Sequence, residues 1–401
     1  MREFRECGAS YDLTVEALPV LQLCAIDEPL FPNLETLNLW GIHKLFIPVI
    51  PLVLSPRVTS IILGFGLGSP DAILASTVSS FPKLCPESQV IRLDFQGYPM
   101  ITAAVSEMVL ATNRNTLQEF DVQSSPLTEE ASAVISKLPN LRSLSVVVER
   151  ETSLSSALLP NLTELELTCD NGGHWPQLFQ RATLGKLNSV TFFLQSTQID
   201  NFLETFEKVA LSSSVQNTLS EFHIFTSCSW NPNYPSLLPF TRLVHLMINL
   251  HCGVGCSSRV DDDIIINLSR AMPKLQVLQL GDDPCREITI GVTAKGLMAL
   301  ALHCPNLRRL RIHFQVASLI TSPTNPGMTP DVEPTGSWTD CALTELVVGN
   351  IPVPEESTLM VTLTLLRIFP RIARIDSCGE EWGEVEDAIF LSKQIVKCSS
   401  R

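Results

Sequence analysis

Residues 303–314 read HCPNLRRLRIHF, and this stretch decides the fold class. Leu307, Leu310 and Ile312 follow the pattern L-x-x-L-x-L, with arginines between them. Because side chains alternate across a strand, the spacing predicts one short strand with a buried apolar face and an exposed basic face. The rest of the chain repeats this unit.

The same spacing recurs about every 28 residues, near the range expected of leucine-rich repeats. The first copies are FPNLETLNL at 31–39, SPRVTSIIL at 55–63 and CPESQVIRL at 85–93, where Ser88 replaces the first apolar residue. Further copies have their first apolar residue at Leu117, Leu141, Leu162, Leu187, Leu219, Leu243, Leu275, Leu307 and Leu343, and a degenerate copy has it at Ile372.

Between these strands the apolar residues are three and four apart, as an amphipathic helix requires. The predicted helices cover residues 100–113, 127–138, 201–211, 261–272 and 293–304. Thr128 is placed as an N-cap, and the run of acidic residues from Asp261 favours a helix N-terminus. Because no unit buries its apolar stripe alone, neighbouring units must stack. We therefore predict an α/β leucine-rich-repeat solenoid, a horseshoe with a parallel sheet on its concave face and helices outside.

The chain divides into a repeat array and its two ends. We predict an N-terminal cap or truncated repeat at 1–30, the array at 31–375 with a flexible Pro-rich loop at 321–340, and a C-terminal capping helix and tail at 376–401. The apolar side of the capping helix is predicted to consist of Val385, Ala388, Ile389, Ile395 and Val396. This helix is expected to protect the open edge of the sheet.

The composition limits the classes of function that the chain can have. Of 401 residues, 45% are hydrophobic and only 17% are charged, so most of the chain must fold. The net charge of −14 argues against a general binder of nucleic acid or anionic membrane, because both need a surplus of cations. The 12 cysteines are scattered, and MREFRECGASYDL carries no secretory signal. We expect reduced, mostly buried thiols in a cytoplasmic or nuclear protein.

The Cys-Pro pairs at Cys304 and Cys85 and the related Pro-Asn-Leu starts resemble the cysteine-containing leucine-rich repeats of F-box proteins. More narrowly, residues 30–375 resemble the fungal F-box and leucine-rich-repeat proteins. In that family the F-box binds the adaptor of a cullin-based ubiquitin ligase, and the repeats hold the protein to be ubiquitinated. The resemblance implies a protein-interaction module that recognises substrates for such a ligase.

The chain departs from the family where the F-box is expected. The first copy begins at Phe31, and ALPVLQLCAIDEPL before it resembles a fragment of another repeat. We therefore expect adaptor binding only if an F-box lies upstream. The alternative is a leucine-rich-repeat adaptor or scaffold unrelated to ubiquitin. In either case we expect no enzymatic activity and no cofactor.

The partner-binding residues are expected at the polar positions of the strands, on the concave face. The predicted set is Arg308, Arg309, Arg311, Arg374, Glu119, Asp121, Glu164, Glu166 and Glu221. It has an acidic centre and a basic end, where arginine forks suit carboxylates or phosphates. The alternative is a solvated face that only keeps the protein soluble.

Other motifs predict no chemistry. His251, Cys252 and Cys256 lack the second ligand pair of a structural zinc site, which favours buried thiols. The glycines at 64–68 follow a strand but lack the Lys-Ser/Thr of a phosphate loop, which favours a turn. A Cys-His pair stays open, because such pairs meet in space and not in sequence. No catalytic residue and no metal ligand is predicted.

Overall fold

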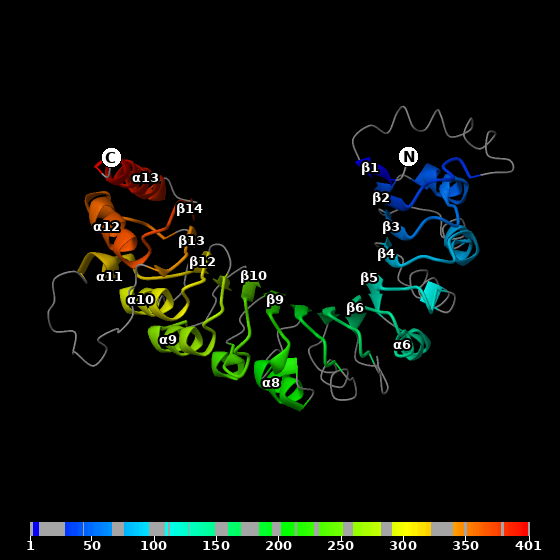
Figure 1. Cartoon of the computed structure of the whole chain (residues 1–401), viewed down its shortest axis with the longest axis horizontal. Coiled ribbons are helices and arrows are strands. Elements are labelled where there is room, and N and C mark those ends of the chain that lie inside the picture. Colours follow the sequence, from blue (N-terminus) through cyan, green and yellow to red (C-terminus); the bar gives the residue numbers. More distant parts are fainter. Residues whose placement is uncertain are drawn as a thin grey trace. The chain divides into compact units, whose positions relative to one another are not determined.

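The structure is a computed structural model of the chain, and its strands and helices form two compact units, Met1–Leu187 and Asn188–Arg401. In each unit, strands that pair do so in parallel, and helices lie on one side of an open sheet (Figure 1). Each unit is therefore α/β. The structure describes residues 3–7, 29–42, 44–65, 76–95, 109–110, 113–126, 128–148, 159–169, 184–194, 202–212, 215–227, 232–251, 260–281, 291–321, 340–348, 351–377 and 381–399.

In the first unit the strands lie in the sheet in chain order. They are β1 Glu3–Cys7, β2 Thr36–Ile42, β3 Ser60–Phe65, β4 Val90–Phe95, β5 Glu119–Pro126, β6 Ser143–Val148 and β7 Glu164–Cys169. Short helical segments connect them: η1 Lys44–Val49, α2 Ile50–Val53, α4 Phe81–Leu84 and α6 Glu129–Ile135.

The second unit has the same order and longer helices. Its strands are β8 Ser189–Leu194, β9 Glu221–Ser227, β10 His245–His251, β11 Val277–Leu280, β12 Arg309–Ile312, β13 Glu345–Val348 and β14 Arg374–Ser377. Its helices are α8 Phe202–Ser212, η2 Val215–Asn217, η3 Tyr234–Leu237, α9 Asp262–Ala271, α10 Ala294–His303, α11 Val316–Thr321, η7 Glu355–Ser357, α12 Thr358–Ile368 and α13 Glu381–Ser399. None of these helices, nor any other in the described residues, has the length and apolar character that crossing a membrane requires.

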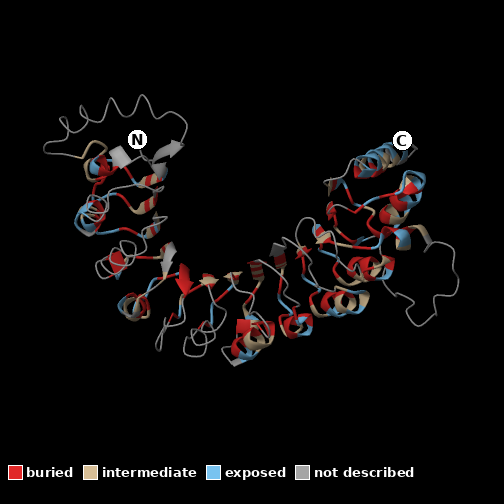
Figure 2. Ribbon diagram, turned by 180° about the vertical axis from the view of Figure 1, so that it is seen from behind, coloured by how far each residue is buried: buried red, intermediate tan, exposed pale blue. Residues whose placement is uncertain are grey.

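The predicted repeat spacing matches the strands. A strand begins two residues after each predicted first position, and β1 adds a strand that the spacing did not predict. The first positions are all buried: Leu34, Val58, Ser88, Leu117, Leu141, Leu162, Leu187, Leu219, Leu243, Leu275, Leu307, Leu343 and Ile372. Within most strands, buried residues alternate with exposed or partly exposed ones (Figure 2), whereas β6, β11 and β13 are buried at every position after the first. The buried ones form the core between sheet and helices.

The cysteines of the repeat starts hold neighbouring copies together. The Cys85 thiol donates to the carbonyl of Ser55 at 3.3 Å, and Ser55 has the same place in the preceding copy. In the same way the Cys304 thiol donates to the carbonyl of Met272 at 3.5 Å. All four described cysteine side chains that are free thiols, including Cys169 and Cys341, are buried. For these residues the prediction of reduced, buried thiols is confirmed.

The helix N-termini are capped largely as predicted. The Thr128 hydroxyl accepts from the backbone N–H of Ala131 at 3.1 Å, and the Asp261 carboxylate accepts from that of Ile264 at 2.9 Å. These bonds satisfy donors that a helix start leaves without partners. The predictions of helices at 127–138, 201–211, 261–272 and 293–304 are confirmed by α6, α8, α9 and α10. Of the helix predicted at 100–113, only residues 109 and 110 are described as helical.

The last helix covers the edge of the second unit's sheet. The side chain of Trp382 in α13 is 1% exposed, and its indole N–H donates to the carbonyl of Ile351 at 2.7 Å. The Glu386 carboxylate of α13 accepts from the backbone N–H of Ile375 in β14 at 3.2 Å. An amide at the sheet edge thereby gains a partner.

Two predictions are wrong in detail. Ile395 was placed on the apolar side of the last helix, but its side chain is 68% exposed, because the helix continues past the part that covers β14. Gly64 was placed in a turn, yet it lies in β3. A Cβ on Gly64 would lie 2.3 Å from Cε3 of Trp40, so glycine is needed for this close approach. Of the Pro-rich loop predicted at 321–340, residues 322–339 lie outside the described residues.

Candidate functional site

The polar positions of the strands define one face of each sheet. In β12, for example, Leu310 and Ile312 are buried, whereas Arg309 is exposed and Arg311 partly exposed. Because side chains alternate across a strand, the buried positions face the helices and the others face away from them. Figure 2 shows the burial of the residues along the strands. We call the face that points away from the helices the open face of each unit. The predicted partner-binding residues lie on it or at its border.

In the first unit the open face carries a row of charged and hydroxyl groups. The strand register aligns Arg92, Asp121, Ser145 and Glu166 across β4 to β7. The Ser145 hydroxyl donates to Oε1 of Glu166 at 3.2 Å. The guanidinium of Arg92 forms an ion pair with the carboxylate of Glu119. The structure therefore brings three of the predicted acidic residues together, with an arginine among them.

Two of these carboxyl groups are hard to ionise. The pKa of Asp121 is raised from its ordinary 3.8 to about 6, because the group is largely buried and because the Glu166 carboxylate repels its charge. A hydrogen bond from Ser145 and the charge of Arg92 oppose this rise. Burial also raises the pKa of Glu166. Glu164, the other predicted acidic residue of this unit, is exposed at the start of β7.

The basic strand of the second unit is less basic than the sequence predicts. The register places Glu345 of β13 between Arg309 of β12 and Arg374 of β14. Oε1 of Glu345 lies 3.6 Å from Nε of Arg309, so one cation is paired with a carboxylate. Arg308 directly precedes β12, which begins at Arg309, so it does not belong to the strand. Arg311 lies two residues after Arg309 in β12, on the same face of the strand.

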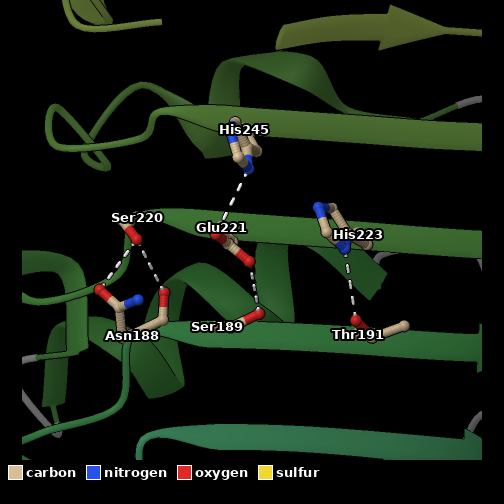
Figure 3. Close-up of polar contacts among 7 residues, drawn as sticks. All are labelled: Asn188, Ser189, Thr191, Ser220, Glu221, His223 and His245. Atoms are coloured by element: carbon tan, nitrogen blue, oxygen red, sulfur yellow. Dashed lines mark hydrogen bonds and ion pairs between the residues drawn. The ribbon is translucent and has the colours of Figure 1, made fainter. Parts of the chain in front are cut away.

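Glu221, the remaining predicted acidic residue, lies among histidines. Figure 3 shows Glu221 and His223 on the same side of β9, with His245 of β10 opposite Glu221. Nδ1 of His245 is 3.3 Å from Oε1 of Glu221. The Ser189 hydroxyl of β8 donates to the other carboxylate oxygen, Oε2, at 3.1 Å. One donor atom each from Glu221, His223 and His245 lie within 4.8 Å of one another.

His223 is the most enclosed member of this group. Nδ1 of its ring lies 3.4 Å from the Thr191 hydroxyl, and Nε2 is buried without a hydrogen-bond partner. Burial lowers the pKa of His223, and the nearby His245 adds to this effect, while Glu221 opposes it. The ring is thereby kept in its neutral form, which leaves a lone pair on one nitrogen.

An aromatic pair continues the open face beyond the histidines. The rings of Phe193 in β8 and Phe225 in β9 are stacked, with centroids 4.8 Å apart and planes 12° from parallel. Phe225 is two residues past His223 on the same strand, so its side chain points to the same side of the sheet. The site thus combines an apolar surface with charged and imidazole groups, a mixture that suits a protein surface.

The sequence prediction missed His245, Glu345 and Arg92. A signal for the first two was present, because each lies two residues after the first apolar position of its copy, as Glu221 and Arg309 do. Aligning the copies by column would have placed His245 beside Glu221 and Glu345 beside Arg309. Arg92 lies four residues after Ser88, two residues further along its strand than the position that Glu221 and Arg309 occupy in their copies.

Other sequence candidates fall partly outside the described residues. Cys252 and Cys256 of the HCGVGC stretch and the glycines after residue 65 are among them. The sequence Asn161-Leu162-Thr163 matches a glycosylation motif, but the Asn161 amide already donates to the carbonyl of Pro139 at 2.8 Å. Its oxygen accepts from Nζ of Lys186 at 2.7 Å. This asparagine joins neighbouring copies of the repeat.

Comparison of the chain with protein-family models finds no match, and comparison with curated proteins finds no significant one. The functional interpretation therefore rests on the geometry of the two open faces. Many of their polar side chains are partly exposed, arranged in columns and paired across neighbouring strands. These groups are suited to contacts by complementary charge and hydrogen bonding.

Proposed function

We propose that this chain is a leucine-rich-repeat solenoid that binds a protein partner on its open face. It serves as the substrate-recognition part of an F-box-type, cullin-based ubiquitin-ligase receptor. Support for the repeat class comes from the parallel strand that begins within each L-x-x-L-x-L unit. Further support comes from the cysteine thiols, which donate to the preceding copy at the Cys-Pro position.

The observation that carries the binding proposal is one column of side chains in the second unit. Across β9 and β10 the column holds Glu221 and His245, and across β12, β13 and β14 it holds Arg309, Glu345 and Arg374. Val277 of β11 separates the two groups. Within each of the two groups, ionisable side chains of both signs lie on neighbouring strands and are exposed or partly exposed, which favours a partner with charges of both signs.

The preferred partner is a folded protein or peptide. The net charge of −14 disfavours nucleic acid and anionic lipid, which demand many unpaired cations. Arg309 and Arg311 offer planar guanidinium groups that match carboxylates in pairs of hydrogen bonds. A partner with acidic side chains facing β12 fits this part of the face.

The test replaces the two arginines of β12. Arg309→Glu with Arg311→Glu is expected to abolish capture of the face-dependent partner and leave thermal unfolding nearly unchanged, because both side chains lie on the open face. Arg367→Glu is the matched control, since Arg367 is exposed on α12. Partners are captured with the purified chain and quantified by mass spectrometry. Equal capture by the double variant and the control would contradict the proposed surface.

The ubiquitin branch of the proposal needs its own test. The natural protein that carries this chain is mixed with the purified adaptor of the cullin ligase, and complex formation is measured by gel filtration. Formation of a stable complex supports a substrate receptor. If no complex forms while the partner of the open face is still captured, the chain is an adaptor or scaffold without a link to ubiquitin.

A further inference from the structure

We propose that Glu221, His223 and His245 form a site for a divalent zinc ion on the open face of the second unit. Within the described residues, these are the side chains that bring three donor atoms of metal-binding type within 4.8 Å of one another (Figure 3). Two imidazoles with one carboxylate are a known donor set for zinc, and they leave a fourth position free.

The strand geometry sets up the site. Glu221 and His223 are two residues apart on β9, so both side chains leave the strand on the same face. His245 is the register partner of Glu221 on the neighbouring parallel strand. Parallel strands lie about 4.8 Å apart, a separation that two side chains of this length span around one ion.

The distances come close to those of a bound metal. Donor atoms that share one zinc ion at about 2.0–2.2 Å lie about 3.3–3.5 Å from each other in a tetrahedron. Nδ1 of His245 and Oε1 of Glu221 are already 3.3 Å apart. The donor nitrogen of His223 lies within 4.8 Å of both, so binding of an ion requires this nitrogen to move closer to them.

Neighbouring hydroxyl groups orient the proposed ligands. The Ser189 hydroxyl holds Oε2 of Glu221, which leaves Oε1 to the metal. The Thr191 hydroxyl lies beside Nδ1 of His223, and Figure 3 shows the other ring nitrogen directed away from it. Such second partners fix the ring orientation of zinc-bound histidines in many proteins.

The strongest single sign is the state of Nε2 of His223. This nitrogen is buried and has no hydrogen-bond partner. A buried polar atom without a partner costs free energy, so native proteins rarely keep one without a reason. A zinc ion held by this lone pair supplies the missing partner. The fourth zinc position faces the open side, where water or a side chain of a partner completes the tetrahedron.

The experiment uses the full chain after removal of metals with a chelator. Zn²⁺ binding is measured by calorimetry, and Co²⁺ binding by visible absorption, because four-coordinate Co²⁺ has a distinctive spectrum. We expect one ion per chain, with the bands of nitrogen and oxygen ligands and no thiolate-to-cobalt band. His245→Gln and Glu221→Gln should each weaken binding at least about tenfold, and Ser189→Ala about tenfold.

The control is His303→Gln, which removes another partly exposed imidazole, from α10, and should bind like the unaltered chain. Circular dichroism establishes that each variant folds, and the two ligand variants change different strands, so the test survives the misfolding of one. The proposal is overturned if the chain binds no Co²⁺, if the ligand variants bind as tightly as the control, or if the spectrum shows thiolate ligands.

Discussion

Among the carboxyl groups that the structure describes, Asp121 has the environment that differs most from that of a solvated carboxylate. Its side chain is largely buried in the row of charged groups on the open face of the first unit, and its pKa is raised to about 6. In the folded protein, ionisation of Asp121 must overcome burial and the charge of Glu166. The unfolded chain has neither obstacle, so ionisation favours unfolding.

Replacing Asp121 by Asn should therefore stabilise the protein at neutral pH. The folded pKa lies above the ordinary 3.8, so the favourable contribution of the protonated form is complete below about pH 4 and lost as the pH rises through about 6. We expect Asp121→Asn to raise the free energy of unfolding by about 1–2 kcal/mol at pH 7. The gain over the unaltered chain should vanish near pH 4, as measured by urea unfolding at both pH values.

Glu164→Gln serves as the control for that comparison. It also removes one carboxylate from the open face, but Glu164 is exposed at the start of β7. Its effect should be small at both pH values. A gain for Asp121→Asn that is equally large at pH 4 and pH 7 would show that ionisation is not its cause.

At the scale of single residues, the sequence predicted which side chains are buried better than it predicted which side chains they contact. Leu307, Leu310 and Ile312 are buried as their spacing requires, and Arg309 lies on the open face. The pairing of Arg309 with Glu345 was not predictable from one copy, because the residues are far apart in sequence and meet only through the register of two strands. The same limit applies to every contact between neighbouring copies.

Some helices could be predicted from their local sequence pattern, whereas another forms because of tertiary packing. The helices with clear period and caps, such as α9 and α10, were predicted, but α12 was not. Its sequence, TLMVTLTLLRI, is rich in β-branched residues, which favour strands. Packing overrides this preference, because Val361, Leu365 and Ile368 are buried on one side of the helix.

The start of α10 depends on the helix before it. The Asp262 carboxylate of α9 accepts from the backbone N–H of Thr293 at 2.8 Å, from its hydroxyl at 2.6 Å, and from the N–H of Gly296 at 3.0 Å. A Cβ on Gly296 would lie 2.6 Å from Oδ1 of Asp262, so glycine at this position makes room for the carboxylate. One side chain thus caps the helix of the next copy.

Asp262→Ala should lower the free energy of unfolding of the second unit by about 2–3 kcal/mol, because it leaves the donors at the start of α10 without an acceptor. The measurement is urea unfolding followed by circular dichroism. Asp263→Ala provides a matched comparison, since Asp263 is exposed in the same turn, and should cost below about 1 kcal/mol. Equal losses in the two variants would assign the effect to the dipole of α9 instead.

At the scale of the whole molecule, the end strand of an open sheet has backbone groups that can pair with another chain. In the second unit α13 covers one such edge. It packs against β14 and α12, buries Trp382, and supplies Glu386 to the backbone of Ile375. The helix thereby combines a buried aromatic anchor with a hydrogen bond to the edge strand.

Deleting residues 381–401 should therefore lower thermal stability and cause association through β14. The loss of the buried indole alone corresponds to about 3–5 kcal/mol. Thermal unfolding and light scattering over a range of protein concentrations report the two effects. Ile395→Glu, which alters an exposed position of the same helix, should leave both unchanged. A truncated chain that stays monomeric and as stable as the full one would contradict the role of α13.

The cysteines between copies give the protein internal reporters of opening. Burial raises the pKa of Cys85 and of Cys304 to about 12, so both thiols stay protonated and unreactive at neutral pH while the copies remain in contact. An alkylating reagent modifies each one only during a transient separation of its copy from the preceding one. The rate of modification of each cysteine therefore measures how often its copy opens locally. Cys85 reports on the first unit and Cys304 on the second.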